Sequence, residues 1–327
     1  MPSRALLTEV QTISNAEIVQ ALGNLKIIAT TGITTTLPTT SSTLAGLSVA
    51  NTFTANQAFS GTISLVTTTS TTGQILQATK RLLHTYGTSN IFLGSEAGNF
   101  ATSGLGKNIG IGRIALQSLQ GGVGNIAIGD ACGFSITGGS SNMLFGEFSG
   151  NQITSGTQNC AVGVSSLRGV TTTSENTAIG FQALYSTTGS KNTGIGVNSS
   201  WTCSSGSKNT FIGEYSGAST DTIGGLLGVG FTTGSNNTML GQNTSTTSAT
   251  GNYRTAIGSD SRCQNDNAIK LGRDTLDVVI LPSMTTTQRN AVSSPAGGSL
   301  IFNTTTGKLN FWNSTAATPA WEAVTSA

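Results

Sequence analysis

Short apolar segments alternate with polar, glycine-rich segments through the middle of the chain, with a period of about 17 residues. The clearest part of each period is a five-residue unit, in which an asparagine, two variable residues, an apolar residue and a glycine follow one another. Such regular spacing predicts a repeat architecture. The asparagines and glycines of the intact units are Asn90 and Gly94, Asn108 and Gly112, Asn125 and Gly129, Asn142 and Gly146, Asn159 and Gly163, Asn176 and Gly180, Asn192 and Gly196, Asn209 and Gly213, and Asn237 and Gly241. Weaker copies end at Gly230, Gly258 and Gly272.

A second, weaker apolar segment follows many of these units, as in Ala115-Leu116 and Ala183-Leu184. Each period is therefore expected to hold two short strands and two turns, which make one coil of a β-solenoid. Helical repeats do not fit, because their periods are longer and each glycine inside a helix costs about 1 kcal/mol. The fold class predicted is all-β, a parallel β-solenoid or β-roll with coils of about 17 residues.

Each position of the unit has an expected structural role when coils stack about 4.8 Å apart. The apolar residues before the glycine, such as Ile128, Phe145, Val162 and Ile179, are expected to point inward as a continuous column. The glycine is expected to supply a turn with positive φ or room for close backbone approach. The asparagine can hydrogen-bond its own turn and form a ladder with its counterparts in neighbouring coils.

Charged residues recur beside the unit and are expected to form outward columns. Arg113, Asp130 and Glu147 each follow the glycine in consecutive coils. Asp130 and Glu147 offer a cation site as one interpretation. A solvated column partly neutralised by Arg113 is the interpretation we prefer, because exposed ion pairs contribute about 0–1 kcal/mol.

The flanks differ from the repeat and predict separate segments. Ser14-x-x-Glu17 matches a helical capping box. Near the other end, Thr285 or Thr286 is expected to cap a short helix, followed by a hairpin with strands at 298–303 and 308–312. The predicted organisation is an N-terminal anchor helix region (1–28), a Thr/Ser-rich linker (29–48), a β-shaft (49–85), the solenoid (86–280) and a C-terminal tip or cap module (281–327).

Composition weighs against several classes of protein. Charged residues make up 9% of the chain and the net charge is +2, so neither a basic nucleic-acid stripe nor charge-driven disorder is expected. No apolar run approaches the ~20 residues of a membrane span, and the N-terminal residues lack a signal-peptide pattern. The four cysteines, Cys132, Cys160, Cys203 and Cys263, have no metal-ligand spacing and are expected to be free and mostly buried.

Residues for catalysis are sparse, so we expect the protein not to be an enzyme and to need no cofactor or metal. The single histidine, His84, has no acid and nucleophile at a recognisable spacing. A polysaccharide depolymerase would need paired carboxylates. The pairs close in sequence are Asp274 with Asp277 and Asp260 with Asp266. The alternative hypothesis of a depolymerase rests on these two pairs.

The repeat also carries a family resemblance. Asn176-Thr-Ala-Ile-Gly-Phe-Gln-Ala-Leu-Tyr-Ser-Thr-Thr-Gly-Ser-Lys-Asn192 resembles repeats of bacteriophage and large-virus fibre proteins, and is similar to the head domain of trimeric autotransporter adhesins. Residues 51–65 and 284–312 resemble a tail-fibre shaft and tip. The resemblance implies a homotrimer of parallel β-rolls, assembled in the host cytoplasm, joined to other virion proteins through its N-terminal region and exposing its C-terminal module.

These observations predict a structural fibre or spike of a virion that mediates host attachment. A passive capsid or tail component and a cell-surface trimeric adhesin remain alternatives, although an adhesin would be expected to carry an export signal and a membrane anchor. Ice binding would need a Thr-x-Thr array at one coil position, whereas the threonines are expected to lie in variable turns. Trp312 and Trp321 are candidates for contact with a receptor or glycan; the other interpretation places them in the core of a small trimeric cap.

Overall fold

The computed structural model describes residues 62, 64–101, 106–218, 222–223, 226–227, 230, 232–273, 277–316 and 318–324. The predicted anchor helix region (1–28) and linker (29–48) lie outside these residues, as does most of the predicted shaft. In its described part, the shaft contains an antiparallel hairpin of β1 (Ile75–Gln77) and β2 (Lys80–His84). Strand β2 then pairs antiparallel with the first strand of the repeat region.

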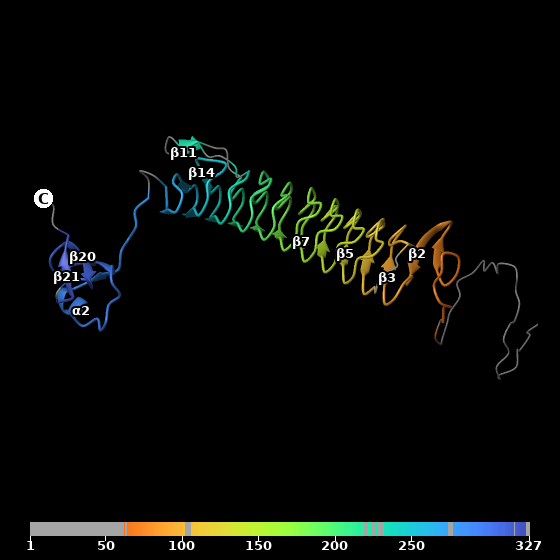
Figure 1. The fold of residues 1–327 in the computed structure, drawn as a ribbon, viewed down its shortest axis with the longest axis horizontal. Coiled ribbons are helices and arrows are strands. Elements are labelled where there is room, and N and C mark those ends of the chain that lie inside the picture. The colour runs from red at the N-terminus through yellow and green to blue at the C-terminus, as the bar shows by residue number, and fades with distance from the viewer. Residues whose placement is uncertain are drawn as a thin grey trace, which may run out of the picture. The chain divides into compact units, whose positions relative to one another are not determined.

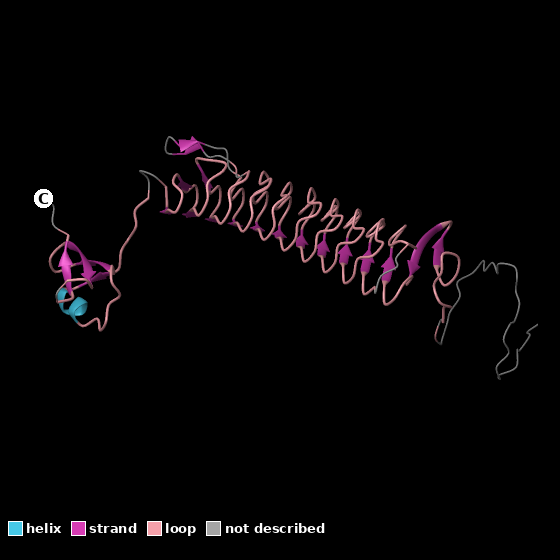
Figure 2. Cartoon of the chain, viewed as in Figure 1, coloured by secondary structure: helices cyan, strands magenta, loops and turns pink. Residues whose placement is uncertain are grey.

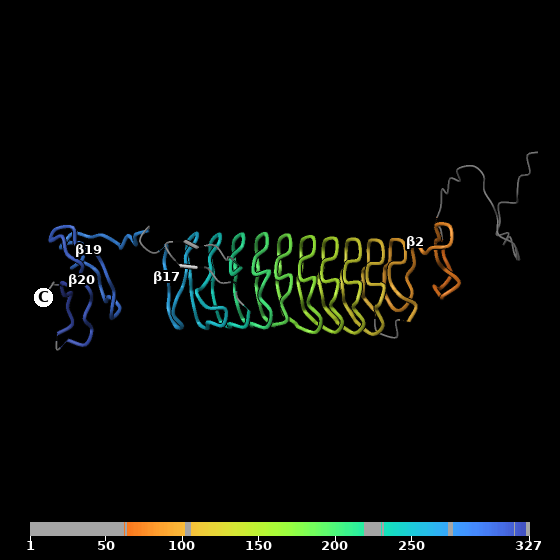
Figure 3. The backbone as a smooth tube through the Cα atoms, turned by 90° about the horizontal axis from the view of Figure 1, so that it is seen from above, coloured from red at the N-terminus to blue at the C-terminus, as the bar shows by residue number. Residues whose placement is uncertain are grey.

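The repeat region is a β-solenoid, as the sequence predicts (Figure 1). Three-residue strands, one from each coil, pair in parallel and in register along one face. Figure 2 shows these short strands joined by long turns, and Figure 3 shows the coils following one another as stacked loops. The parallel strands are β3 (Ile91–Leu93), β4 (Ile109–Ile111), β5 (Ile126–Ile128), β6 (Met143–Phe145), β7 (Cys160–Val162), β8 (Thr177–Ile179), β9 (Thr193–Ile195), β10 (Thr210–Ile212), β13 (Thr238–Leu240), β15 (Thr255–Ile257) and β17 (Ile269–Leu271).

The prediction of two strands in each coil is wrong for most coils. The second segment forms a strand only near the C-terminal end of the described solenoid, where β14 (Ser245–Thr246) pairs with β16 (Arg262–Cys263). Elsewhere it contains residues with positive φ, such as Leu116 at 52° and Leu184 at 48°, which an extended strand does not accommodate. Its amides still bond the next coil, as in Leu116 N–H to the Cys132 carbonyl at 3.1 Å.

The weak copy ending at Gly230 is not a coil, which corrects the sequence alignment. Strand β10 pairs directly with β13, and Asn237 bonds to Asn209 across 28 residues. The intervening chain includes an antiparallel pair, β11 (Thr222–Ile223) and β12 (Leu226–Leu227). The copies ending at Gly258 and Gly272 do form strands of the ladder, β15 and β17.

The inward column of the strands is also different from the prediction. In each strand of the parallel ladder from β3 to β15, the middle residue is buried, and the residues on either side of it point outward. Ile128, Phe145, Val162 and Ile179 therefore lie outside the core, and Val162 and Ile179 are about 40% exposed. The reason is the pleat: the two variable residues before the apolar one include the core-facing position, and adjacent strand residues point to opposite sides.

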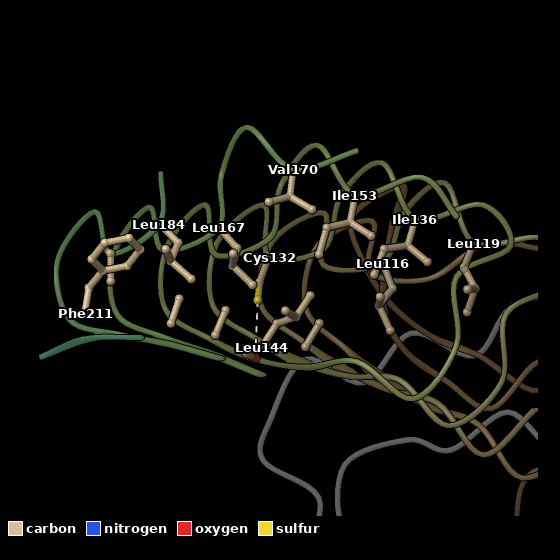
Figure 4. Close-up of a cluster of buried hydrophobic side chains, with 14 of the residues drawn as sticks. Leu116, Leu119, Cys132, Ile136, Leu144, Ile153, Leu167, Val170, Leu184 and Phe211 are labelled. Atoms are coloured by element: carbon tan, nitrogen blue, oxygen red, sulfur yellow. Dashed lines mark hydrogen bonds between the residues drawn. The ribbon is translucent and has the colours of Figure 1, made fainter. Parts of the chain in front are cut away.

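The core contains several positions of each coil, among them Leu119, Ile136, Ile153 and Val170 (Figure 4), and in six coils two further core positions compensate for one another. One is the middle strand residue, and the other lies six residues later. In these six coils the second residue is glycine where the first is large and leucine where the first is small; other coils differ, as in Ala127 with Gly133 and Gly194 with Ser200. The pairs are Phe92 with Gly98, Leu144 with Gly150, Phe211 with Gly217, Gly110 with Leu116, Ala161 with Leu167, and Ala178 with Leu184.

The C-terminal module is a separate four-stranded sheet with one short helix. Its strands, in sheet order, are β18 (Ser283–Met284), β19 (Leu300–Asn303), β20 (Lys308–Asn313) and β21 (Ala320–Ala323). Helix α2 (Thr286–Asn290) begins at Thr285, which forms a complete capping box with Gln288. The helix and the β19–β20 hairpin lie where the sequence predicts them. In the described part of the chain, no helix is long and apolar enough to cross a membrane.

Candidate functional site

The predicted repeat residues form two continuous columns inside the solenoid. The asparagines are buried, and each backbone N–H donates to the side-chain oxygen of the asparagine one coil before it, as in Asn125 N–H to Asn108 Oδ1 at 2.9 Å. The Asn125 Nδ2 group donates to Asn108 Oδ1 at 3.1 Å and to the Gly139 carbonyl at 2.8 Å. The asparagine ladder thus satisfies buried polar groups at the entry to each ladder strand from β3 to β13.

The glycines after the strands stack with no room for a side chain. Gly94, Gly112, Gly129, Gly146, Gly163, Gly180, Gly196, Gly213 and Gly241 have φ between 130° and 142°. A Cβ atom on Gly146 would lie 2.5 Å from the carbonyl oxygen of Gly163 in the next coil. Both the conformation and the contact require glycine, so this column has a structural role.

The outward face of the strand ladder combines one apolar column with one column that changes from apolar residues to threonine. Its third strand position is an aliphatic or phenylalanine side chain in every described parallel strand, from Leu93 in β3 to Leu271 in β17. Its first position is apolar from Ile91 to Cys160, then threonine from Thr177 to Thr255. The threonines therefore do form a column, contrary to the expectation that they lie in turns, but the pattern is Thr-x-Ile or Thr-x-Leu and not Thr-x-Thr. We call these two outward columns together the strand face.

Charged columns flank the coils as ion pairs. Arg113 Nη2 lies 2.8 Å from Asp130 Oδ2, and Lys191 Nζ lies 3.6 Å from Glu175 Oε1. Both pairs are solvent-exposed. Among the described residues, no cluster of three or more His, Cys, Asp or Glu side chains has the arrangement of a metal site.

His84 lies at the N-terminal edge of the solenoid in an aromatic cluster. Its Nε2 is 2.8 Å from the Ala97 carbonyl oxygen, and its Nδ1 accepts the Tyr86 N–H at 3.3 Å. The ring packs against Phe92 and Phe100 at centroid distances of 4.8 and 4.9 Å. Both nitrogens are satisfied when the neutral ring carries its proton on Nε2, and burial lowers the pKa of this imidazole. The histidine thus covers the first coil.

One carboxylate of each pair considered for catalysis is held by an arginine, whereas Asp260 Oδ2 lies 3.3 Å from the Ser259 hydroxyl. Asp266 Oδ1 accepts from the buried Arg254 Nε at 2.6 Å, and this contact lowers the pKa of Asp266. Asp277 accepts from Arg273 at 2.9 Å, which lowers its pKa in the same way. Asp274 lies outside the described residues. Arg254 occupies the position of the ladder asparagine, and its N–H bonds to Asn237 Oδ1 at 2.9 Å. Sequence reasoning missed this replacement, although an arginine in the asparagine position of the copy ending at Gly258 is visible in the sequence.

The cysteines are free, and their environments differ. Cys132, Cys203 and Cys263 are buried, whereas Cys160 is half-buried on the strand face. Burial raises the pKa of the Cys132 thiol to about 12, so this thiol stays protonated at neutral pH.

The two candidate tryptophans lie together in the C-terminal module. Trp312 and Trp321 are directly opposite one another on β20 and β21, with their ring centroids 5.7 Å apart in an edge-to-face arrangement. Together with Arg289, Asn290, Val292 and Ala320 they line an open pocket of about 310 Å³. Arg289 Nη1 is oriented by the buried Asn310 Oδ1 at 3.0 Å. Aromatic faces beside a fixed guanidinium are a chemistry that suits sugar rings or acidic groups.

Comparison with known families gives one match. Residues 256–327, less than a quarter of the chain, match a family described as a phage tail-like trimerisation region. The matched segment begins within β15 and includes β17 and the whole described part of the C-terminal module. No curated protein and no solved structure matches the chain. The family match supports a phage tail-fibre-like structural protein with a self-associating C-terminal part.

Proposed function

We propose that the chain is the subunit of a homotrimeric virion fibre that attaches to the host. The observation that carries this proposal is the match to a phage tail-like trimerisation region directly after a repeat solenoid. A solenoid holds what lies at its two ends apart, because each coil contacts only its neighbours and adds a constant rise. The N-terminal region would join the fibre to other virion proteins, and the C-terminal module would be exposed.

The pocket between Trp312 and Trp321 is the proposed receptor contact. It combines two half-buried indole rings with the Arg289 guanidinium, which is held by Asn310 and by the Asn290 side-chain oxygen at 2.8 Å. A surface glycan carrying an acidic group fits this chemistry. Because Asp266 and Asp277, one carboxylate of each candidate pair, are each bound by an arginine, we propose binding without catalysis.

Binding of the purified fibre to host cells tests this function. Trp321→Ala is expected to lower cell binding at least about tenfold, the loss of one aromatic contact worth about 1.4 kcal/mol. Trp201→Ala is the matched control, since Trp201 is 43% exposed on the solenoid. Equal binding by both variants would remove the pocket from the proposal.

Labelling of intact particles separates an attachment fibre from a passive component. Antibody to residues 284–327 is expected at the free tips of projecting fibres in electron micrographs. Label against the shell would mean a passive structural role, and absence from the particle would mean a protein such as a cell-surface adhesin. Release of oligosaccharide from host polysaccharide would instead favour the depolymerase alternative.

A further inference from the structure

The strand face is a row of exposed apolar side chains that runs along the described solenoid. Along it, Ile91, Leu93, Met143, Val162, Ile179 and Leu240 are each between 39% and 48% exposed. At about 4.8 Å per coil, the eleven described strands make a strip about 50 Å long. Isolated exposed apolar residues are normal in soluble proteins, whereas a continuous strip indicates an interaction surface.

The uniformity of this face contrasts with the core. The buried middle position of the strands varies from Gly110 to Phe92, since a second side chain in the same coil compensates for it. The third position is Ile, Leu, Val or Phe in every strand. Position by position, the outward column is therefore more uniformly apolar than the inward one, and this indicates that it meets the same apolar environment at each coil.

We infer that the strand face packs against the strand faces of two further copies of this chain, so that the trimer contact runs along the solenoid. The inference rests on the proposed trimer. A second copy is a partner with the same coil spacing, and it can therefore meet every rung of a 50 Å strip with an equivalent rung. The segment that matches the trimerisation family begins within β15, so it already contains Ile257 and Leu271 of the same column.

Charge agrees with this orientation. From β3 to β15 the two outward strand positions of the ladder contain no Lys, Arg, Asp or Glu. The corner after the glycine carries Arg113, Asp130 and Glu147 in three consecutive coils, and the exposed Val164, Phe181 and Val197 in the next three. A core free of charge with a charged rim is the usual composition of a protein interface. The threonine part of the column, from Thr177 to Thr255, keeps the surface free of charge while reducing its apolar area.

Cys160 offers a probe already present in the chain. It lies on the strand face at the first position of β7, and the other three cysteines are buried. Packed sheet faces lie about 10 Å apart, so Cys160 thiols of neighbouring copies would lie within reach of a short bismaleimide. The full-length native protein is treated with this reagent and analysed by denaturing electrophoresis, after light scattering has established its mass in solution.

The expected result is a mass of three chains of 33.1 kDa and covalent linkage through Cys160, abolished in Cys160→Ser. The matched control carries Ser155→Cys in the Cys160→Ser background, because Ser155 is exposed in a turn away from the strand face. Linkage through Cys160 is expected to be at least roughly tenfold faster than linkage in the Ser155→Cys control. The reason is that thiols held close together by the contact have a higher effective concentration. Equal rates in a trimer would overturn the inference and leave the proposed function standing.

A charge variant gives an independent readout. Ile179→Glu with Ile212→Glu places like charges on the strand face without changing the core, and is expected to abolish Cys160 linkage in a protein that remains trimeric through its C-terminal part. Gln152→Glu with Thr172→Glu, at exposed positions off the strand face, is expected to keep the linkage. Unchanged linkage in the first variant would overturn the inference. A monomeric native protein would overturn the trimer itself and with it the proposed function.

Discussion

The solenoid coils and the C-terminal module differ in what they bury. Each coil from β3 to β8 encloses apolar side chains such as Phe92, Leu144 and Leu184, and its polar backbone is satisfied by the asparagine ladder. In the described part of the module, the buried side chains are Ile301, Asn303 and Asn310, while Leu300 and Phe302 are 45% and 41% exposed. One region carries its own core, and the other exposes much of its apolar surface.

This difference indicates where each region needs other copies. A coil is covered by the neighbouring coils of the same chain, which bury its core. Its strand face stays exposed and is available for contact with other copies. Ile301 is the one buried apolar side chain in the described part of the module, so we expect the module to be marginally stable alone, because small domains depend on burial that a single short sheet does not supply. Self-association is therefore expected to stabilise the module more than it stabilises the coils.

The largest expected effect comes from the glycine column. Gly146→Ala places a Cβ 2.5 Å from the next coil at φ 132°, so we expect a loss of about 3–6 kcal/mol from strain and overpacking. Gly138→Ala is the control, since no atom lies within 4 Å of its added Cβ. Urea melting followed by circular dichroism measures both. Similar urea midpoints for the two variants would show that neighbouring coils can move apart without loss of stability. The contrast between the coils and the module would then fail.

The core compensation predicts a double-mutant cycle of smaller size. Leu144→Ala is expected to cost about 2–5 kcal/mol by opening a cavity. Gly150→Leu alone is expected to destabilise as well, because its Cβ would lie 2.9 Å from the Leu144 side chain. Together they recreate the arrangement of Ala161 with Leu167, and most of the stability should return. Additive losses would mean that the two positions do not share one space.

The fold was predictable because the stacking of similar coils requires the same residue types at a regular spacing, and this spacing is visible in the sequence. The asparagine and glycine positions could be read directly, since a ladder bond and a positive φ each restrict the residue type. The direction of the strand side chains could not be read in that way. The uniform column of Ile128 and Ile179 looks like a core, whereas the true core column is irregular because Gly110 and Phe92 are balanced elsewhere in their coils.

Other features of the candidate sites were beyond single-sequence reasoning for different reasons. The pairing of Trp312 with Trp321 depends on the register of β20 and β21, which the short connecting loop does not fix in sequence. Arg254 in the asparagine ladder needs Asp266, 12 residues later, to neutralise it. The inverse pairing of large and small residues six positions apart was visible in six of the coils, and it favours the middle residue as the inward position of the strand.

A smaller effect, confined to the module, is expected from Asn303→Ala. Asn303 Oδ1 accepts the N–H groups of Thr305 and Thr306 at 3.0 and 3.3 Å, and its Nδ2 donates to Thr286 Oγ1 at 3.0 Å. Loss of these bonds is expected to cost about 1–3 kcal/mol. Hydrogen exchange should rise across 283–324 and stay unchanged in the coils. Lower protection in the coils as well would show that the two regions unfold together.

The smallest expected effect is a pH dependence at the N-terminal edge of the solenoid, where His84 lies among Phe92, Phe100, Arg81 and Glu96. Burial lowers the pKa of this histidine below its ordinary value of 6.5, so the unfolded chain takes up a proton before the folded one does. The stabilisation is complete above pH 6.5 and declines as the pH falls from 6.5 towards the lowered pKa. Protonation of Nδ1 also removes the acceptor for the Tyr86 N–H.

Hydrogen exchange of residues 84–97 at pH 5 and pH 7.5 measures the effect, with His84→Gln as the variant expected to lose it. Equal exchange of the native protein at both pH values would mean that the edge is held by its aromatic contacts alone.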